Sequence, residues 1–464
     1  MKKYSLIILG GGVAGYTAAF RAVQNGMSVA LFERDQVGGT CLNRGCIPTK
    51  TLLHSSEIYS ERTCWPEMGI IAENVSLNEN AIYSRKDAII QKLRNGILSL
   101  LKANKIDFFS CQASFLDEHS VTAEGEVYTA EKILIATGSS PIQLNIPGIE
   151  LTVNSDRVLE KPLPGQNLII IGGGVIGVEF ASYFADTGRK VTIIEAQERI
   201  LPMMEKELSL QLAALLRKKG ILLKTSASVE SFTKRNTENE TETLCANIRS
   251  GDKTESLCAD QIIISVGRKA NLDGLNLEKI GVQTKRGILV DQNMYTGVAG
   301  IYAAGDVISH IQLAHYAGAT ATVAVESMMG LPHSVDLKTV PSCVYTSPEI
   351  ACVGISEAEC LAQNIEVEIG KYQMGGNGKS MISGADRGYI KTIIEKNTGK
   401  ILGASAFCLR ATDIIGELAL AISQNMRREQ ITQVIHAHPT IMEGILESLE
   451  ASHGRCIYQA PQKK

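Results

Sequence analysis

The sequence predicts an α/β protein in which two similar units, each built on a parallel sheet, precede a third domain of alternating strands and helices. A repeated glycine motif is the first observation: each copy follows an apolar run of strand length and precedes a helix-like segment. The second is spacing, because a glutamate stands 23 positions after the first glycine in both copies. Strand, glycine turn, helix and acid in this order predict two Rossmann-like dinucleotide-binding units. The glycines are Gly10, Gly12 and Gly15 in the first copy and Gly172, Gly174 and Gly177 in the second.

The first unit begins with an apolar strand at residues 4–9 and continues with a helix at 18–24 and a strand at 28–32. The first glycine turns the chain, the second lets a pyrophosphate approach the backbone, and the third packs the helix on the strand. Glu33 ends the second strand, where a carboxylate accepts hydrogen bonds from ribose hydroxyls. The unit is therefore expected to bind a dinucleotide.

The second unit repeats this order with strands at 168–171 and 190–194, a helix at 178–186, and Glu195. A carboxylate at this position repels the 2′-phosphate of NADP, so the sequence favours NAD. Arg199 leaves the NADP alternative open, since an arginine nearby accommodates that phosphate; its other interpretation is a surface cation.

The remaining segments place further strands at 132–139, 261–266 and 301–306. The polar stretch 234–256 predicts an exposed hairpin without identifiable chemistry. From Val340 onward, strands alternate with helix-like segments, the latter around 412–425 and 440–450, which indicates another domain. A chain of 464 residues is expected to form two to four domains.

Two thiols, Cys41 and Cys46, lie five positions apart beside glycines and a cation. A regular helix holds such Cα atoms about 8–9 Å apart, whereas a disulfide needs roughly 4.4–6.8 Å, so a redox pair requires a local tightening that Gly45 permits. Lys50 or Arg44 would lower a thiol pKa and favour the reactive thiolate. Two buried free cysteines, or half of a metal site, remain the alternatives.

Composition narrows the function classes. With 46 basic and 49 acidic residues the net charge is −3, which argues against a nucleic-acid surface. Eleven cysteines, scattered apart from one pair, are a poor disulfide framework and indicate a reducing compartment. No segment has the ~18 uninterrupted apolar residues of a membrane span, and no signal peptide is recognisable. We expect a cytoplasmic protein that acts on small molecules and binds neither membrane nor nucleic acid.

His438 and Glu443 lie five positions apart near the carboxyl end, with Pro439 at a predicted helix entry. A carboxylate beside an imidazole fixes its tautomer and raises its basicity, which suits a general base for a thiol. A structural histidine is the alternative for His438, and His436 is expected to be no more than that. The redox pair favours the catalytic interpretation of His438.

Together these segments resemble the flavin-dependent pyridine nucleotide-disulfide oxidoreductases over essentially the whole chain, and most closely the branch that oxidises dihydrolipoamide. Besides the cysteine segment, the resemblance is carried by residues 136–138, 266–271, 304–306, 313–315 and 438–443. The segment 407–410 departs from the family, where a Gly-Pro-like turn is expected. That departure affects local interface geometry rather than chemistry.

The resemblance implies the site residues. Lys50, paired with Glu179, would lie by the flavin N5, and Asp306 would bind the ribityl chain. FAD would be bound by Gly10, Gly12, Gly15, Glu33, Thr40, Lys50, Ala113, Thr137, Gly138, Glu179, Asp306 and Ala314, and NAD by Gly172, Gly174, Gly177, Glu195, Val229 and Gly267. No metal is expected. The implied domains are FAD-binding (1–147), NAD-binding (148–272), a return to the FAD domain (273–340) and dimerisation (341–464).

The implied activity is oxidation of protein-bound dihydrolipoyl groups by NAD+ through a Cys41–Cys46 redox disulfide and FAD, with His438 of the partner subunit as base and Glu443 orienting it. The implied partners are a second copy of the chain, and the lipoyl domains and core or E3-binding subunits of 2-oxo acid dehydrogenase complexes, or the glycine cleavage system. One alternative is a related NAD(P)H-dependent reductase with another disulfide substrate. A second is a complex-binding subunit or redox sensor, which the intact cysteines and the His438–Glu443 pair argue against.

Overall fold

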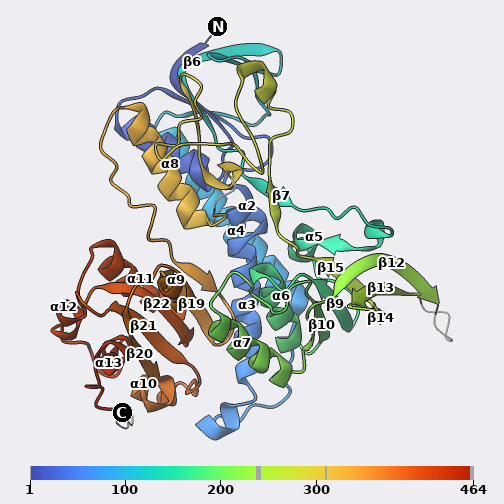
Figure 1. The fold of residues 1–464 in the computed structure, drawn as a ribbon. Helices are drawn as coiled ribbons and strands as arrows, with labels where there is room; N and C mark the ends of the chain where they lie inside the picture. Colours follow the sequence, from blue (N-terminus) through green and yellow to red (C-terminus); the bar gives the residue numbers. More distant parts are fainter. Residues whose placement is uncertain (1, 237–241, 309–310, 460–464) are drawn as a thin grey trace.

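The protein, described here as a computed structural model over residues 2–236, 242–308 and 311–459, is organised around three large sheets (Figure 1). The first is seven-stranded, and its central strands are parallel. Its last strand, β17, follows the whole second sheet in the sequence and pairs with β6, so the chain returns to its first unit. The order is β3 (Asp107–Phe109), β2 (Val29–Phe32), β1 (Lys2–Leu9), β6 (Glu126–Ile135), β5 (Ser120–Ala123) and β4 (Ser114–Asp117), with β17 (Ile301–Ala303) beside β6.

Apolar side chains explain why the first unit forms. Leu6, Ile7 and Ile8 of β1 are fully buried, as expected for a parallel strand covered on both faces. Helices α1 (Val13–Gln24) and α8 (Ala314–Met328) pack against each other over this sheet through small residues such as Ala18. The predicted helix at 18–24 thus begins earlier, at Val13, because Gly15 is accommodated within its first turn.

The second sheet has five parallel strands and follows the predicted pattern closely. Its order is β11 (Leu222–Lys224), β10 (Lys190–Ile194), β9 (Asn167–Ile171), β15 (Gln261–Ile264) and β8 (Val153–Asn154), with α6 (Val175–Asp186) and α7 (Lys206–Lys218) packed against it. The predicted α/β class with two Rossmann-like units is confirmed.

The third sheet is antiparallel and five-stranded. One face carries α11 and α13, and the other packs through Tyr389 and Phe407 against the second unit. In the segment 407–410, where a Gly-Pro-like turn was expected from the family, Arg410 adopts a left-handed conformation (φ 57°) immediately before α11. The sheet order is β18 (Ser342–Val344), β19 (Glu349–Gly354), β22 (Ile401–Cys408), β21 (Tyr389–Glu395) and β20 (Val367–Gln373), and the helices are α11 (Ala411–Ser423) and α13 (Glu443–Ala451).

Further helices and strands connect these layers. Among the described residues, no helix combines the length and the apolar character needed to cross a membrane. The connecting elements are α2 (Gly39–Arg44), α3 (Cys46–Glu61), α4 (Glu79–Ala103), α5 (Ser155–Glu160), α9 (Glu357–Ala362), α10 (Gly378–Ile382), α12 (Arg428–Thr432), β7 (Ser139–Pro141) and β16 (Arg268–Ala270).

The polar stretch 234–256 is more than the exposed hairpin predicted for it. It belongs to an antiparallel three-stranded sheet that packs on the second sheet through buried residues such as Phe232, Ala246 and Ile248. The few apolar residues of this face are separated by polar ones, so the sequence showed no apolar pattern there. Residues 237–241 of the stretch lie outside the described residues. The strands are β12 (Ser228–Asn236), β13 (Glu242–Ser250) and β14 (Lys253–Ala259).

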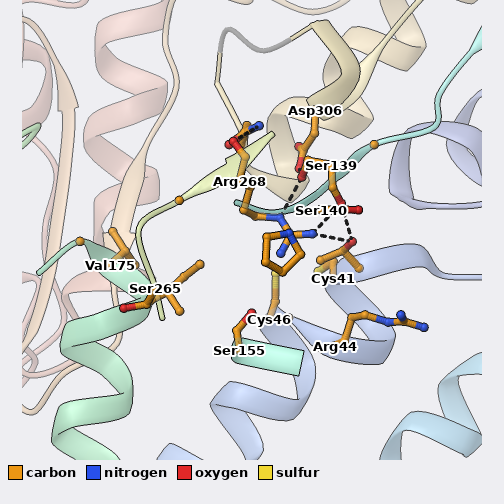
Figure 2. A pocket seen from close by; sticks show the side chains of 18 of the residues that line it. Cys41, Arg44, Cys46, Ser139, Ser140, Ser155, Val175, Ser265, Arg268 and Asp306 are labelled. Carbon is orange, nitrogen blue, oxygen red and sulfur yellow. Dashed lines mark hydrogen bonds between the residues drawn. The ribbon is translucent and has the colours of Figure 1, made fainter. Parts of the chain in front are cut away.

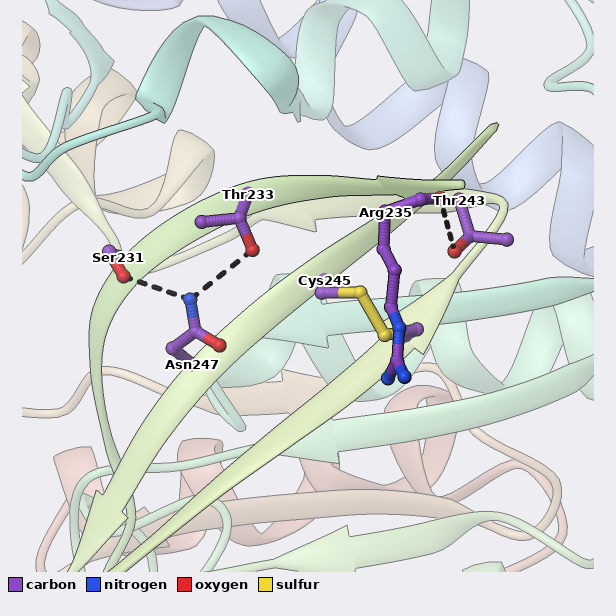
Figure 3. Close-up of a disulfide and its surroundings, with 7 residues drawn as sticks. Ser231, Thr233, Arg235, Thr243, Cys245 and Asn247 are labelled. Carbon is purple, nitrogen blue, oxygen red and sulfur yellow. Dashed lines mark hydrogen bonds between the residues drawn. A yellow bond between two sulfur atoms is a disulfide. The ribbon is translucent and has the colours of Figure 1, made fainter. Parts of the chain in front are cut away.

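This small sheet also holds a disulfide between Cys245 and Cys258 (Figure 3). The two residues are directly opposite each other on β13 and β14; Cys245 is buried and Cys258 is exposed. The sequence indicated a poor disulfide framework and did not predict that these two cysteines pair. Their pairing depends on hairpin register, which the scattered spacing does not reveal.

Replacing Cys258 by serine is expected to destabilise the second unit by about 2–3 kcal/mol, because the disulfide closes a short loop in the unfolded chain. The measurement is the unfolding midpoint of oxidised protein, with the linkage checked by mass spectrometry of an unreduced digest. Cys64→Ser, at an exposed free thiol, is the control and should leave the midpoint unchanged. An unreduced digest without the linked peptide would contradict the assignment.

Candidate active site

One cavity of about 1360 Å³ lies between the first and second sheets. Pockets for a single small ligand usually measure about 300–1,000 Å³, so this cavity has room for more than one such group. Its lining includes both glycine turns and both cysteines of the predicted pair. The predicted residues that line it are Gly12, Glu33, Thr40, Cys41, Cys46, Lys50, Thr137, Gly138, Gly172, Gly174, Glu179, Glu195, Val229, Gly267, Asp306 and Ala314.

The other predicted residues lie beside the cavity or away from it. Gly10 and Ala113 line a smaller space that shares Glu33 and Thr137 with the large cavity. Gly15 and Gly177 lie inside α1 and α6, where an added Cβ would come within 1.8 and 1.9 Å of a carbonyl oxygen of the preceding turn. Both therefore serve close packing, as the motif predicts. His438 and Glu443 are not among the residues that line either space.

The two glycine turns are built for an anion. Helices α1 and α6 begin after Gly12 and Gly174, and within the described chain no side chain caps either helix and neither first turn carries an acid. The first backbone N–H groups therefore remain available for a phosphate, which the helix dipole also favours. Gly10 (φ 108°) and Gly172 (φ 106°) make the preceding turns, and a Cβ there would meet a carbonyl oxygen at 2.3 or 2.5 Å. The turns thus fit two pyrophosphate groups.

Glu33 and Glu195 occupy equivalent places. The Gly11 N–H donates to Glu33 Oε2 at 2.7 Å, and the Gly173 N–H donates to Glu195 Oε2 at 2.6 Å. Each carboxylate also accepts a bond from the backbone two residues further on, at 2.9 and 2.8 Å. Since a carboxylate has about four acceptor positions, each retains acceptors for ribose hydroxyls while it braces its glycine turn.

Arg199 is engaged within its own loop. Its guanidinium donates to the carbonyl oxygens of Leu201 (3.3 Å), Pro202 (2.8 Å) and Met204 (2.8 Å). These bonds use three of the five N–H donors of the guanidinium, and Arg199 is not among the residues that line the cavity. Both observations favour a structural role for Arg199 in its own loop.

The two thiols meet where the helix breaks. α2 ends at Arg44 and α3 begins at Cys46, with Gly45 between them at φ −145° and ψ −111°. Both cysteines are half-buried, and their sulfur atoms are close enough to hydrogen-bond. A hydrogen bond from the Cys41 thiol lowers the pKa of Cys46 to about 7, assisted by Lys50 against the effect of burial. The same hydrogen bond and burial raise the pKa of Cys41, so Cys46 is the favoured thiolate.

Lys50 and Glu179 form the ion pair that the family resemblance implies. The Lys50 ammonium lies 2.9 and 2.7 Å from the two carboxylate oxygens of Glu179, which is 2 % exposed. The Tyr345 backbone N–H also donates to Glu179 at 3.0 Å, and its ring lies 4.4 Å from the ammonium. This pair joins α3 to α6 and fixes a cation beside Cys46.

A polar cluster lies beside the cysteines in the cavity wall, and it joins the predicted residues Thr40 and Asp306 to Ser139 and Arg268, to which the sequence assigned no role (Figure 2). Arg268 donates to Ser139 Oγ (2.8 Å), to the Ser139 carbonyl (2.6 Å) and to Thr40 Oγ1 (3.1 Å). The Ser139 hydroxyl donates to Asp306 at 2.6 Å. Burial raises the pKa of Asp306, opposed by Ser139 and Arg268. Arg268 belongs to the segment 266–271, one of those that carry the family resemblance, but the sequence did not predict its hydrogen bonds.

His438 and Glu443 form their predicted pair in the third domain, outside the cavity. Glu443 Oε1 lies 2.8 Å from His438 Nδ1, and its Oε2 accepts the Thr440 N–H at 2.8 Å. These bonds outweigh burial and lower the pKa of Glu443. The His438 side chain is 73 % exposed, and it is not among the residues of the same chain that line the cavity with the two thiols. His436 is by contrast buried against Glu417 at 3.1 Å.

No three His, Cys, Asp or Glu side chains in the described segments are arranged to hold a metal ion. The cavity instead offers N–H groups at two helix ends, two ribose-sized acceptors and a dithiol beside a cation. This donor set suits two dinucleotides and two-electron exchange.

Comparison with known proteins agrees with this geometry. Residues 4–321 match the family model described as pyridine nucleotide-disulphide oxidoreductase, and residues 340–449 match its dimerisation domain, which supports a homodimer. The chain is 37 % identical to a dihydrolipoyl dehydrogenase of Bacillus subtilis (98 % of this chain, 99 % of the relative) and 36 % identical to one of Geobacillus stearothermophilus (97 % of each).

Solved structures are similar as well. LpdA of Mycobacterium tuberculosis shares the fold, with a TM-score of 0.89 at 24 % identity over 97 % of this chain and 99 % of that one. The HOCl-induced flavoprotein disulfide reductase RclA of Escherichia coli gives 0.85 at 28 % identity over 96 % and 99 %. Given the paired glycine turns, the dithiol and full-length matches to both family models, this chain belongs to the pyridine nucleotide-disulphide oxidoreductase family.

Proposed function

We propose that the chain is a dihydrolipoyl dehydrogenase, which oxidises protein-bound dihydrolipoamide to lipoamide and passes two electrons to NAD+. The observation that carries the proposal is the Cys41–Cys46 dithiol, with its low-pKa Cys46, in a cavity that also contains two dinucleotide-binding turns. Full-length similarity to dihydrolipoyl dehydrogenases supports the choice of substrate. FAD would occupy the first turn and NAD the second, with the domain limits 1–147, 148–272, 273–340 and 341–464.

The proposed reaction begins with the Cys41–Cys46 disulfide. One substrate thiolate attacks Cys41 Sγ, the Cys41–Cys46 bond breaks, and Cys46 leaves as a thiolate stabilised by Lys50. The second substrate thiol, deprotonated by His438 of the partner subunit, then attacks the sulfur joined to Cys41. Cyclic lipoamide leaves, Cys41 is released reduced, and the pair holds two electrons.

FAD, when bound, supplies transfer of those two electrons from the dithiol to the nicotinamide as hydride. The residues of this chain position the groups. Lys50, fixed by Glu179, supplies a cation near the reacting thiolate, while Asp306, oriented by Ser139, supplies an acceptor for the ribityl hydroxyls. Glu443 holds His438 in one orientation, which prepares it to accept a proton.

The third domain completes the site by dimerisation. His438 is exposed, and so are apolar side chains of the same domain such as Leu420 (59 %) and Ile435 (97 %). Exposed apolar residues in the domain that carries this base suit burial against a second copy. Lipoyl domains and the core or E3-binding subunits of 2-oxo acid dehydrogenase complexes, or the glycine cleavage system, are the proposed partners, in the cytoplasm.

The test is steady-state oxidation of dihydrolipoamide with NAD+, compared with reduction of glutathione disulfide by NADPH. We expect fast turnover of dihydrolipoamide with NAD+ and little reduction of glutathione disulfide by NADPH. The reverse result would favour the alternative, a related reductase with another disulfide substrate.

Glu195→Ala is expected to narrow the preference for NAD+ over NADP+ by about tenfold or more, equivalent to ~1.4 kcal/mol. The substitution removes the charge that repels a 2′-phosphate and the acceptor for ribose. The measurement is the ratio of kcat/KM for the two nucleotides, with Glu198→Ala, at an exposed position, as the control. An unchanged ratio would refute this basis for specificity.

A further inference from the structure

A buried ion cluster lies where the third sheet meets the second unit. Lys391 of β21 is 3 % exposed, and its ammonium bonds to Glu205 and to Glu357 (2.7 Å) and lies 3.5 Å from Glu207. Lys371, on the neighbouring strand, bonds to Glu207. A buried ammonium is costly unless paired. Here burial lowers the pKa of Lys391, but the carboxylates outweigh it and raise the pKa overall.

Glu205 connects this cluster to the second unit. It stands immediately before α7, at the end of the loop 201–204. Its other carboxylate oxygen accepts the Ser405 hydroxyl of β22 at 3.0 Å. Two strands of the dimerisation domain therefore hold one residue of the nucleotide-binding unit.

The loop before Glu205 reaches the predicted NAD site. The Leu201 N–H donates at 2.8 Å to the carbonyl of Gly173, which lies between Gly172 and Gly174 of the second turn. Leu201 has φ 47°, a conformation that a leucine keeps only where its surroundings enforce it. Pro202 and Met203 line the cavity, and Met203 is 96 % exposed. The loop is thus a rim of the NAD site: Gly173 holds its first residue, Arg199 bonds to three of its carbonyl oxygens, and Glu205 holds the end that leads into α7.

We propose that Lys391 is a positioning residue for NAD(H): through Glu205 it holds the rim 201–204 against the second glycine turn. The inference rests on the proposed function, since it assigns the second turn to NAD. Loss of the Lys391 charge leaves Glu205 without its buried partner and loosens the rim. The dithiol is unaffected, because Cys41 and Cys46 lie on α2 and α3 and share no hydrogen bond with the cluster.

Lys391→Met in the flavin-loaded dimer tests the proposal. KM for NAD+ is expected to rise about tenfold while kcat changes less than about twofold. The rate at which dihydrolipoamide alone reduces the enzyme should stay unchanged. Lys396→Met is the matched control, because Lys396 follows the same strand and pairs at 3.1 Å with Glu366 where both are exposed.

Glu205→Gln is a second variant that tests the proposal even if Lys391→Met does not fold. The substitution keeps the shape of the side chain but removes the charge that pairs with Lys391, so it is also expected to raise KM for NAD+. In the double variant, KM should rise less than the product of the two single effects, since both remove one interaction.

An unchanged KM for NAD+ in a folded Lys391→Met or Glu205→Gln variant would overturn the inference. Equal losses in the dithiol step and in NAD+ reduction would also overturn it, because they indicate a structural role alone. A wild-type enzyme that oxidises no dihydrolipoamide with NAD+ would instead refute the proposed function, so the two failures are distinguishable.

Discussion

Cys41→Ser is expected to abolish NAD+ reduction by dihydrolipoamide while the protein still binds flavin. Serine cannot form the disulfide that accepts the two electrons, and its hydroxyl is no substitute for a thiol in exchange. The cavity keeps its shape, because both glycine turns and the Lys50–Glu179 pair lie outside the substitution. The measurement is steady-state turnover, normalised to the flavin absorbance of the purified protein.

Cys343→Ser is the matched control. Cys343 also lines the cavity, but burial raises its pKa to about 12, so it stays a protonated thiol at neutral pH. Its replacement should leave turnover within about twofold of wild type, since a protonated thiol is a poor nucleophile. Undiminished turnover in Cys41→Ser, or equal losses in the two variants, would remove the dithiol from the mechanism.

His438→Gln is expected to slow the dithiol step by about 10²–10⁴-fold, the usual contribution of a general base. Glutamine keeps a polar group near Glu443 but cannot accept the proton of the substrate thiol. The measurement is the rate at which dihydrolipoamide reduces the enzyme anaerobically. His436→Gln removes the neighbouring imidazole, which is buried against Glu417, and should have a much smaller effect on this rate.

Hybrid dimers of the two inactive variants test whether the site is shared. A dimer of one Cys41→Ser chain and one His438→Gln chain has one intact site if each site takes Cys41 from one chain and His438 from the other. Mixing and reassociating the variants should therefore restore activity. If both residues act from the same chain, the hybrid has no intact site, and the absence of recovery would contradict the proposed dimer.

The sequence predicted the two nucleotide units well because their determinants are local. An apolar strand, a glycine turn and an acid at fixed spacing define each unit without reference to the rest of the chain. The structure accordingly places Glu33 and Glu195 in matching contacts with Gly11 and Gly173. The sequence also predicted the pairing of Glu443 with His438, because only five positions separate the two residues.

Other features depend on contacts between distant residues and could not be predicted. Arg268 meets Thr40 across 228 positions, and Lys391 meets Glu205 across 186, so neither contact leaves a periodic pattern. The Cys245–Cys258 pair required the register of β13 and β14. The polar composition of the stretch 234–256 predicted an exposed hairpin, whereas its strands belong to a sheet with one buried apolar face.

The proposed electron path can be followed directly by anaerobic titration of the purified, flavin-loaded dimer with dihydrolipoamide. Because Cys46 has a pKa of about 7 and lies near Lys50, its thiolate should produce a long-wavelength absorbance band against the flavin. Adding NAD+ should then remove this band and yield NADH in proportion to the enzyme reduced. A protein that binds no flavin, or one whose flavin spectrum dihydrolipoamide leaves unchanged, would contradict the account.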